Sequence, residues 1–254
     1  MHSWKGEIQL PAKTLTPEEK LNRFEDLREI KNLMGRMSAD YLDCKQGGMF
    51  AAYWSKRDDV CLAVNSGYFT GRDAIAAYYA NQSDRVALES ALIKAHFPDD
   101  LADKSDDEIF GVGHMDYKPV ETAIIEIAGD RKTAKGLWCL RGAHAKFTPY
   151  GPWGMWEWGW LAADFVMDDG EWRIWHLQYI IDVLKKAGTN WLEPAPEAEV
   201  IPQFAALADF KEAEPNVPAA IHENYHPGRP FSPSPRQPEP YETFSETFSY
   251  GMED

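Results

Sequence analysis

Residues 136–147 read GLWCLRGAHAKF, and their side chains alternate in character along the chain. Successive side chains of a β-strand point to opposite faces of the sheet, so this alternation predicts a strand. Trp138, Leu140 and His144 then share one face, and Arg141 lies on the other. The face that carries the apolar residues is expected to line the interior of the fold. His144 is either a catalytic residue that faces a cavity there or a polar residue near a sheet edge, and we favour the first interpretation.

Further strand-like runs flank this stretch on both sides. The four runs together are 112–130, 132–147, 153–170 and 171–184. Between them, AGDRK (128–132) and MDDGEW (167–172) are typical of hairpin turns, with glycine at the tight positions. The second half of the chain therefore predicts an antiparallel meander.

Helical patterns precede the meander. Residues 15–46 begin with the helix-start signal Thr16-Pro17 and then repeat apolar residues every three or four positions. Residues 47–56 and 71–94 also predict helices, and 59–71 a short strand and turn. The acidic stretch 97–110 is expected to be a solvated loop. Helices followed by strands predict an α+β fold, with the helices packed on one face of a curved antiparallel sheet.

The last part of the chain has a different composition. Eleven of the seventeen prolines fall between Pro194 and Pro240. Such a segment does not form a conventional core, yet its five rings from Phe231 to Tyr250 are too many for a solvated linker. We therefore expect one folded domain over residues 1–190 and an extended arm over residues 191–254. The arm is expected to pack on its own subunit or on a neighbouring one.

Composition excludes several classes of partner. The 254 residues carry a formal charge of −15, which argues against a nucleic acid or an anionic membrane as partner. The three cysteines form no CxxC pair, and this fits a reducing cytoplasm. The N-terminal residues lack the apolar core of a secretory signal, and no run approaches the roughly 20 apolar residues of a membrane span. No HExxH, GxGxxG or P-loop motif is present, so neither a metal nor a cofactor is expected.

Three residues combine into a candidate site for proton transfer. Asp43 follows the first long helix, His114 begins the first run of the meander, and His144 lies in the second. A carboxylate and two imidazoles are typical of general acid–base catalysis near neutral pH. Each residue taken alone has an alternative interpretation. Asp43 is then a solvated carboxylate at a helix end, and the two histidines are structural.

In their order along the chain, these stretches resemble the SnoaL-like branch of the nuclear transport factor 2-like superfamily. The resemblance covers roughly residues 20–185 and rests on YLDCK, GHMDY and LRGAHAKF, together with the closing strand DGEWRIWHLQYIID. It implies a cone-shaped α+β barrel, and it assigns catalytic roles to Asp43, His114 and His144, with Tyr41 as a further candidate. It also implies a dimer or trimer.

Within this branch the chain resembles scytalone dehydratase, but it departs from that enzyme in the third strand. Small polar residues hold the substrate there in the dehydratase, whereas this chain has WEWGWLAAD (156–164). The tryptophans favour a larger, flatter substrate, and Glu157 among them is a candidate buried acid with a raised pKa. The residues expected to bind the substrate are Tyr53, Trp54, Tyr68, Trp138, Leu140, Glu157 and Tyr179.

The resulting hypothesis is a cofactor-independent lyase for a small aromatic substrate. Overall length, an aromatic pocket and the long extension are similar to sphingomonad lyases that act on lignin-derived diarylpropanes. Such an enzyme removes water and formaldehyde through a quinone methide and leaves a stilbene. One alternative is a dehydratase or isomerase of a polycyclic or steroid-like compound. A non-catalytic binding protein is the other, because this fold supports both enzymes and non-enzymes.

Overall fold

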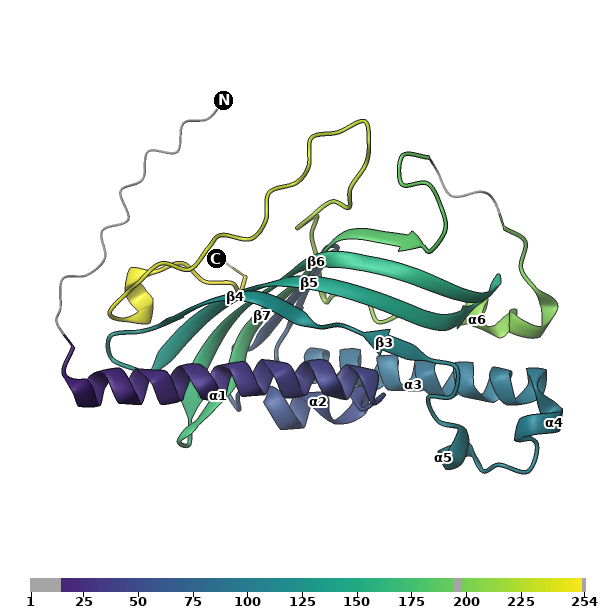
Figure 1. Ribbon diagram of the computed structural model, residues 1–254, viewed down its shortest axis with the longest axis horizontal. Helices are drawn as coiled ribbons and strands as arrows, with labels where there is room; N and C mark the ends of the chain where they lie inside the picture. The colour runs from purple at the N-terminus through teal and green to yellow at the C-terminus, as the bar shows by residue number, and fades with distance from the viewer. Residues whose placement is uncertain (1–14, 194–197, 253–254) are drawn as a thin grey trace.

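The computed structural model describes residues 15–193 and 198–252, so the N-terminal residues on which the expectation about a leader rests lie outside it. Three main helices lie along one face of a curved sheet, and the C-terminal arm crosses the opposite face (Figure 1). They are α1 (Pro17–Leu42), α2 (Gln46–Tyr53) and α3 (Arg72–His96). The predicted α+β fold is confirmed. Within the described part of the chain, no helix is both long and apolar enough to cross a membrane.

Helix α1 begins and packs as its sequence predicts. Thr16 caps the first turn, accepting from the backbone of Glu19, whose side chain in turn accepts from the backbone of Thr16. Ile30, Met34 and Met37 are buried at three- and four-residue spacing. This spacing produces one apolar stripe, and the stripe packs on the sheet.

The sheet has eight strands. They are β1 (Cys61–Val64), β2 (Gly67–Thr70), β3 (Met115–Tyr117), β4 (Val120–Ile127), β5 (Thr133–Thr148), β6 (Gly151–Asp168), β7 (Glu171–Lys186) and β8 (Val217–Pro218). Their order is β3-β5-β6-β7-β1-β2-β8, and β4 also pairs with β5. The sequence predicted an antiparallel sheet, but the sheet is mixed, because β1 runs parallel to β7. These two strands are far apart in sequence, so the chain has room for the crossover that parallel pairing needs.

Two expected elements differ in detail. The run 112–130 forms two strands, because Pro119 has no N–H for the ladder and separates β3 from β4. The acidic stretch 97–110 is not an unbroken loop, since it contains the short helices α4 (Pro98–Leu101) and α5 (Asp106–Ile109). Ser105 starts α5 with a capping box to Glu108, a signal that the charge content of the segment obscured.

Strand β5 has the predicted alternation. Trp138, Leu140 and His144 are buried on the face that meets the helices, whereas Arg141 is exposed. Trp138 belongs to the main core and lies edge-on to Phe165 at 6.0 Å between ring centroids. The inner face of β5 therefore passes from the apolar core at Trp138 to a polar environment at His144.

The arm packs on its own subunit: its first part contacts α3, β8 extends the sheet at β2, and its last part lies on the outer face of the sheet. It contains η1 (Pro202–Phe204), α6 (Ala206–Asp209), β8 and η2 (Phe244–Glu246). Near its end, the rings of Phe248 and Tyr250 cover the buried Lys135, whose Nζ lies 2.5 Å from Asp164 Oδ1. The Nδ1 atom of His176 contacts the same carboxylate at 2.8 Å. His176 faces away from the side of His144, and the chain's own arm covers this outer face at Ser249.

Candidate active site

His144 lies between two buried carboxylates. Asp116 on β3 is directly opposite His144 on β5, and Asp116 Oδ1 is 2.8 Å from the imidazole Nδ1. On the other side of the ring, Glu157 Oε2 of β6 lies 2.9 Å from Nε2. The contacts are at ion-pair distance but not in aligned hydrogen-bond geometry, and Nε2 has no hydrogen-bond partner among the described residues. A substrate group can therefore compete for Nε2.

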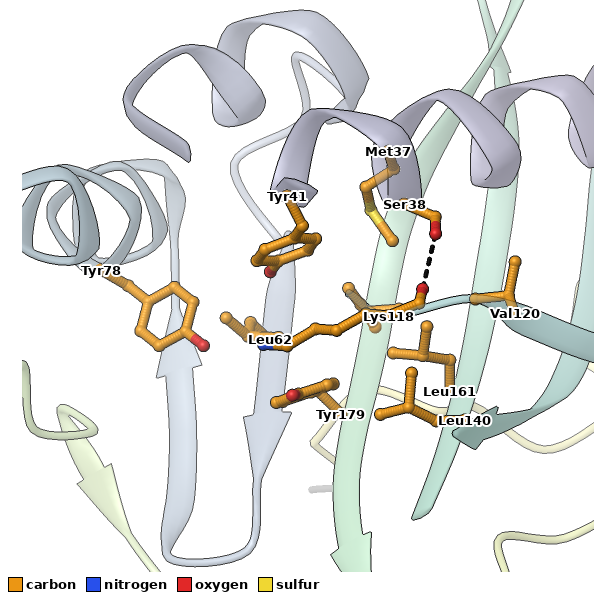
Figure 2. A pocket seen from close by; sticks show the side chains of 11 residues that line it. Met37, Ser38, Tyr41, Leu62, Tyr78, Lys118, Val120, Leu140, Leu161 and Tyr179 are labelled. Carbon is orange, nitrogen blue, oxygen red and sulfur yellow. Dashed lines mark hydrogen bonds between the residues drawn. The ribbon is translucent and has the colours of Figure 1, made fainter. Parts of the chain in front are cut away.

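Lys118 is the central cation of this cluster. Its Nζ lies 3.2 Å from Asp116 Oδ2 and also packs over the rings of Tyr41 and Tyr179, 4.6 and 4.9 Å from their centroids. Figure 2 shows the lysine chain passing between these rings toward Tyr78. The Ser38 hydroxyl donates to the Lys118 carbonyl at 2.5 Å and so fixes the lysine backbone to α1. The ammonium is held inside the fold.

The charges of this cluster set its protonation states. Burial by itself raises the pKa of Asp116, but Lys118 and His144 outweigh it and hold that pKa below its ordinary value. Burial also raises the pKa of Glu157, but Lys118 and His144 outweigh it and lower that pKa overall. The prediction of a raised pKa for Glu157 is therefore wrong. Burial lowers the pKa of His144, yet the contacts with Asp116 and Glu157 raise it above its ordinary value overall. The cluster therefore favours two carboxylates with an imidazolium between them.

His114 forms a second imidazole–carboxylate pair. Its Nδ1 lies 2.9 Å from Oε2 of Glu89, which is fully buried in α3. Arg85, one turn earlier in α3, donates from Nε to Glu89 Oε1 at 2.9 Å. The other imidazole nitrogen, Nε2, is buried and has no hydrogen-bond partner within residues 15–193 and 198–252. Glu89 thus orients His114 and leaves one ring nitrogen free for chemistry.

Both histidines line one cavity of about 320 Å³. This volume lies at the small end of the range of ligand pockets. Its lining includes Tyr78, Arg85, His114, Asp116, Lys118, His144, Lys146, Glu157, Tyr179 and Glu212. A narrow apolar pocket of about 10 Å³, drawn in Figure 2, adjoins it and shares Tyr78, Lys118 and Tyr179. The cavity has room for a small molecule, whereas the narrow pocket has room for about one water.

Residues 22–178 match the SnoaL-like domain, and this match covers more than half of the chain. The chain belongs to the SnoaL-like family. None of the curated proteins matches the sequence.

Several solved structures are similar to this SnoaL-like chain. A protein provisionally named scytalone dehydratase, from Novosphingobium aromaticivorans, is 12% identical over 71% of this chain and 99% of its own, with a TM-score of 0.48. The hexachlorocyclohexane dehydrochlorinase LinA-type3 of Novosphingobium barchaimii is 14% identical over 69% and 99%, with a TM-score of 0.48. A protein of unknown function from Mycobacterium tuberculosis is 14% identical over 78% and 92%, with a TM-score of 0.44.

The structure does not bring Asp43 to the histidines of the SnoaL-like site. Asp43 is the C-cap of α1, and its carboxylate is 2.7 Å from Lys45 Nζ with 55% of the side chain exposed. Cys44, the next residue, has a positive φ of 56°, so the chain turns away at this point. The carboxylate that contacts His144 is Asp116, and the predicted role of Asp43 has no geometric support.

The remaining predicted residues divide into two groups. Tyr41, Leu140 and Tyr179 line the narrow apolar pocket, and Tyr179 also donates to Glu157. The others lie elsewhere: Tyr53 donates to Asp40, Trp54 donates to Tyr79, Tyr68 lies on β2 and Trp138 packs in the core. Substrate contacts predicted for this second group have no support from their positions.

The tryptophans of β6 do not form the predicted aromatic pocket. Glu157 is buried on the inner face, so its neighbours Trp156 and Trp158 point outward. Trp156 is 43% exposed, and Trp158 packs on Trp191 with ring centroids 4.3 Å apart. The aromatic walls of the site are tyrosines instead.

Sequence reasoning missed Asp116, Lys118, Glu89 and Arg85. A signal for two of them was present, because His114, Asp116 and Lys118 recur at every second position of HMDYK. Polar residues with a strand period indicate one polar face. Glu89 and Arg85 are four residues apart on α3, a spacing that is equally typical of a surface ion pair. Within the described residues, no group of three or more His, Cys, Asp and Glu side chains is placed to hold a metal.

Proposed function

We propose that this SnoaL-like protein is a cofactor-independent lyase for a phenolic, multi-ring small molecule, with His144 as general acid and His114 as general base. The observation that carries the proposal is the pair of histidines on one cavity, each held by a buried carboxylate. Positioned imidazoles of this kind contribute typically 10²–10⁴-fold to proton-transfer steps. The two rings differ in surroundings, which favours different roles.

His144 is suited to donate a proton. Its raised pKa keeps the imidazolium form populated at neutral pH, because Asp116 and Glu157 both favour the positive charge. His144 lines the cavity, and its buried Nε2 has only the unaligned contact with Glu157, which a substrate hydroxyl can replace. Protonation of that hydroxyl allows it to leave as water.

His114 is suited to accept a proton. His114 lines the cavity, and with its Nδ1–H donated to Glu89 the lone pair of the buried Nε2 has no competing protein donor among the described residues. The carboxylate orients the ring and stabilises the positive charge that develops when Nε2 takes a proton. The arrangement provides an acid and a base on the wall of one cavity.

A lignin-derived diarylpropane diol would use both groups. With the para phenol ionised, proton transfer from His144 breaks the benzylic C–O bond, and water and a quinone methide form. His114 then removes the proton of the terminal hydroxyl, and its C–C bond breaks to release formaldehyde. The electron pair of that bond forms the stilbene double bond and returns the ring to a phenolate. His144 has then lost one proton and His114 has gained one. Transfer of one proton from His114 to His144, directly or through solvent, returns the protein to its starting state.

A substrate panel tests this proposal. Metal-stripped wild type and His144→Ala are incubated with phenolic diaryl diols, and both the conjugated alkene absorbance and formaldehyde are measured. We expect both products from wild type and a large loss in the variant. Alkene without formaldehyde would instead support a dehydratase. A panel without any turnover, but with measurable binding, would support a binding protein and contradict the lyase.

The pH dependence of turnover gives a second prediction. An imidazolium acid with a raised pKa remains active above the ordinary histidine pKa of about 6.5 and loses activity as the pH rises through the raised value. Glu157→Gln removes one of the carboxylates that raise this pKa, so the alkaline limb of kcat is expected to move to lower pH. Profiles of kcat for the two proteins, measured from pH 5 to 10, check the direction. An alkaline limb unmoved by the substitution contradicts His144 as the acid.

A further inference from the structure

Lys146 is a charged residue of the cavity to which the proposed proton transfers assign no role. It follows His144 by two positions on β5 and lies on the same inner face, where it lines the same cavity. Two residues of a strand span roughly 6.5–7 Å, so the lysine is offset from the imidazole along the cavity wall. Its position is fixed by the same alternation that brings His144 inside.

Lys146 differs from the other cations of the cavity. Each of those contacts a carboxylate: Lys118 contacts Asp116, His144 contacts Asp116 and Glu157, His114 contacts Glu89, and Arg85 contacts Glu89 and Glu212. In the part of the chain that the structure describes, the Nζ of Lys146 forms neither an ion pair nor a hydrogen bond. The ammonium is available to a ligand.

Lys146 is half-buried, and burial, followed by the nearby charge of Arg85, lowers its pKa. Glu89 and Asp116 act in the opposite direction from a distance, and Lys118 adds to the lowering. An anion bound at Nζ would offset the cost of holding an unpaired charge in this half-buried position.

We propose that Lys146 binds an anionic oxygen of the substrate, carried by the aromatic ring whose side chain reacts at His144. This inference rests on the proposed function and adds a specificity-determining residue to it. The offset along β5 is comparable to the length of a ring with its two para substituents. A para oxyanion at Lys146 therefore places the benzylic carbon near His144. A phenolate and a carboxylate both supply the required chemistry.

Three matched probes test the proposal by equilibrium binding, without catalysis. They are 4-nitrophenol at pH 8.5, where it is ionised, 4-nitrobenzoate, and the uncharged 4-nitroanisole. A hydrogen bond to a charged partner corresponds to roughly tenfold to hundredfold in affinity. We expect wild type to prefer at least one anion over 4-nitroanisole by that factor, and Lys146→Met to lose the preference while it still binds 4-nitroanisole. The phenolate and carboxylate arms identify which group is selected.

The same replacement at Lys132, which is exposed in the turn before β5, is the matched control and is expected to keep the preference. Retained binding of 4-nitroanisole shows that the cavity of the Met variant is intact. If Lys146→Met does not fold, the affinities of the wild type still test the proposal, because equal affinity for all three probes would overturn it. A preference that persists in Lys146→Met overturns it too. An anion preference without turnover of any diaryl diol would leave the anion site standing and reject the proposed reaction, so the two failures are distinguishable.

Discussion

Asp116→Asn is expected to reduce kcat about 10²–10⁴-fold, whereas Asp43→Asn is expected to leave it unchanged. Asp116 lies 2.8 Å from His144 and 3.2 Å from Lys118, and its negative charge supports both cations. An amide carries no charge, so the pKa of His144 falls and less imidazolium is present at neutral pH. Asp43 makes its ion pair with Lys45 at the surface, where replacement changes little.

Asp116 acts through His144, so the prediction needs a readout beyond lost activity. The alkaline limb of kcat is expected to shift to lower pH in Asp116→Asn, and lowering the pH is expected to recover part of the activity. Thermal unfolding of both variants shows whether each one folds. Equal losses in the two asparagine variants, or a loss confined to Asp43→Asn, would return the catalytic carboxylate to the end of α1.

The contrast between these two aspartates shows what the sequence could and could not predict. Alternation along β5 correctly predicted that His144 faces inward, because one buried face fixes the orientation of every side chain of a strand. A position at the end of a helix has no such constraint. The direction of Asp43 depends on the left-handed turn at Cys44, which the sequence did not indicate.

The partner of His144 depends on strand register, which composition does not encode. Asp116 meets His144 only because Met115–Tyr117 pairs with Ala143–Ala145 in one particular register. A shift by one residue would turn Asp116 to the other face. The tryptophans of β6 are a different case, since their alternation with Glu157 was visible in WEWGW. What the pattern lacked was an indication of which face was the inner one.

Lys118→Met is expected to lower the free energy of unfolding by about 3–5 kcal/mol at neutral pH, the usual result of removing one partner of a buried ion pair. Lys118 is buried, and its charge is a main cause of the lowered pKa of both Asp116 and Glu157. Methionine keeps most of the volume of the side chain. The two carboxylates would then share His144 as their nearest cation.

The sign of the pH dependence distinguishes charge from packing. In wild type, the lowered pKa of each carboxylate contributes stability that is present above the unfolded value of about 4 and is lost as the pH falls through the folded value. In Lys118→Met these folded pKa values rise, so that contribution is reduced. The difference in stability between the two proteins should therefore be largest at neutral pH and shrink as the pH falls through the folded carboxyl pKa values of the variant.

Urea unfolding of wild type, Lys118→Met and the exposed-site variant Lys132→Met at pH 7, 5, 4 and 3 measures this difference, and the last variant is expected to change stability by less than about 0.5 kcal/mol. A loss of the same size at every pH would mean that Lys118 acts through the packing of its stem between Tyr41 and Tyr179. A loss that shrinks toward acidic pH would mean that the buried ammonium of Lys118 keeps the two carboxylates ionised. Ionised Asp116 and Glu157 are also what raises the pKa of His144, so the stability experiment tests the charge state that the proposed general acid requires, without any substrate.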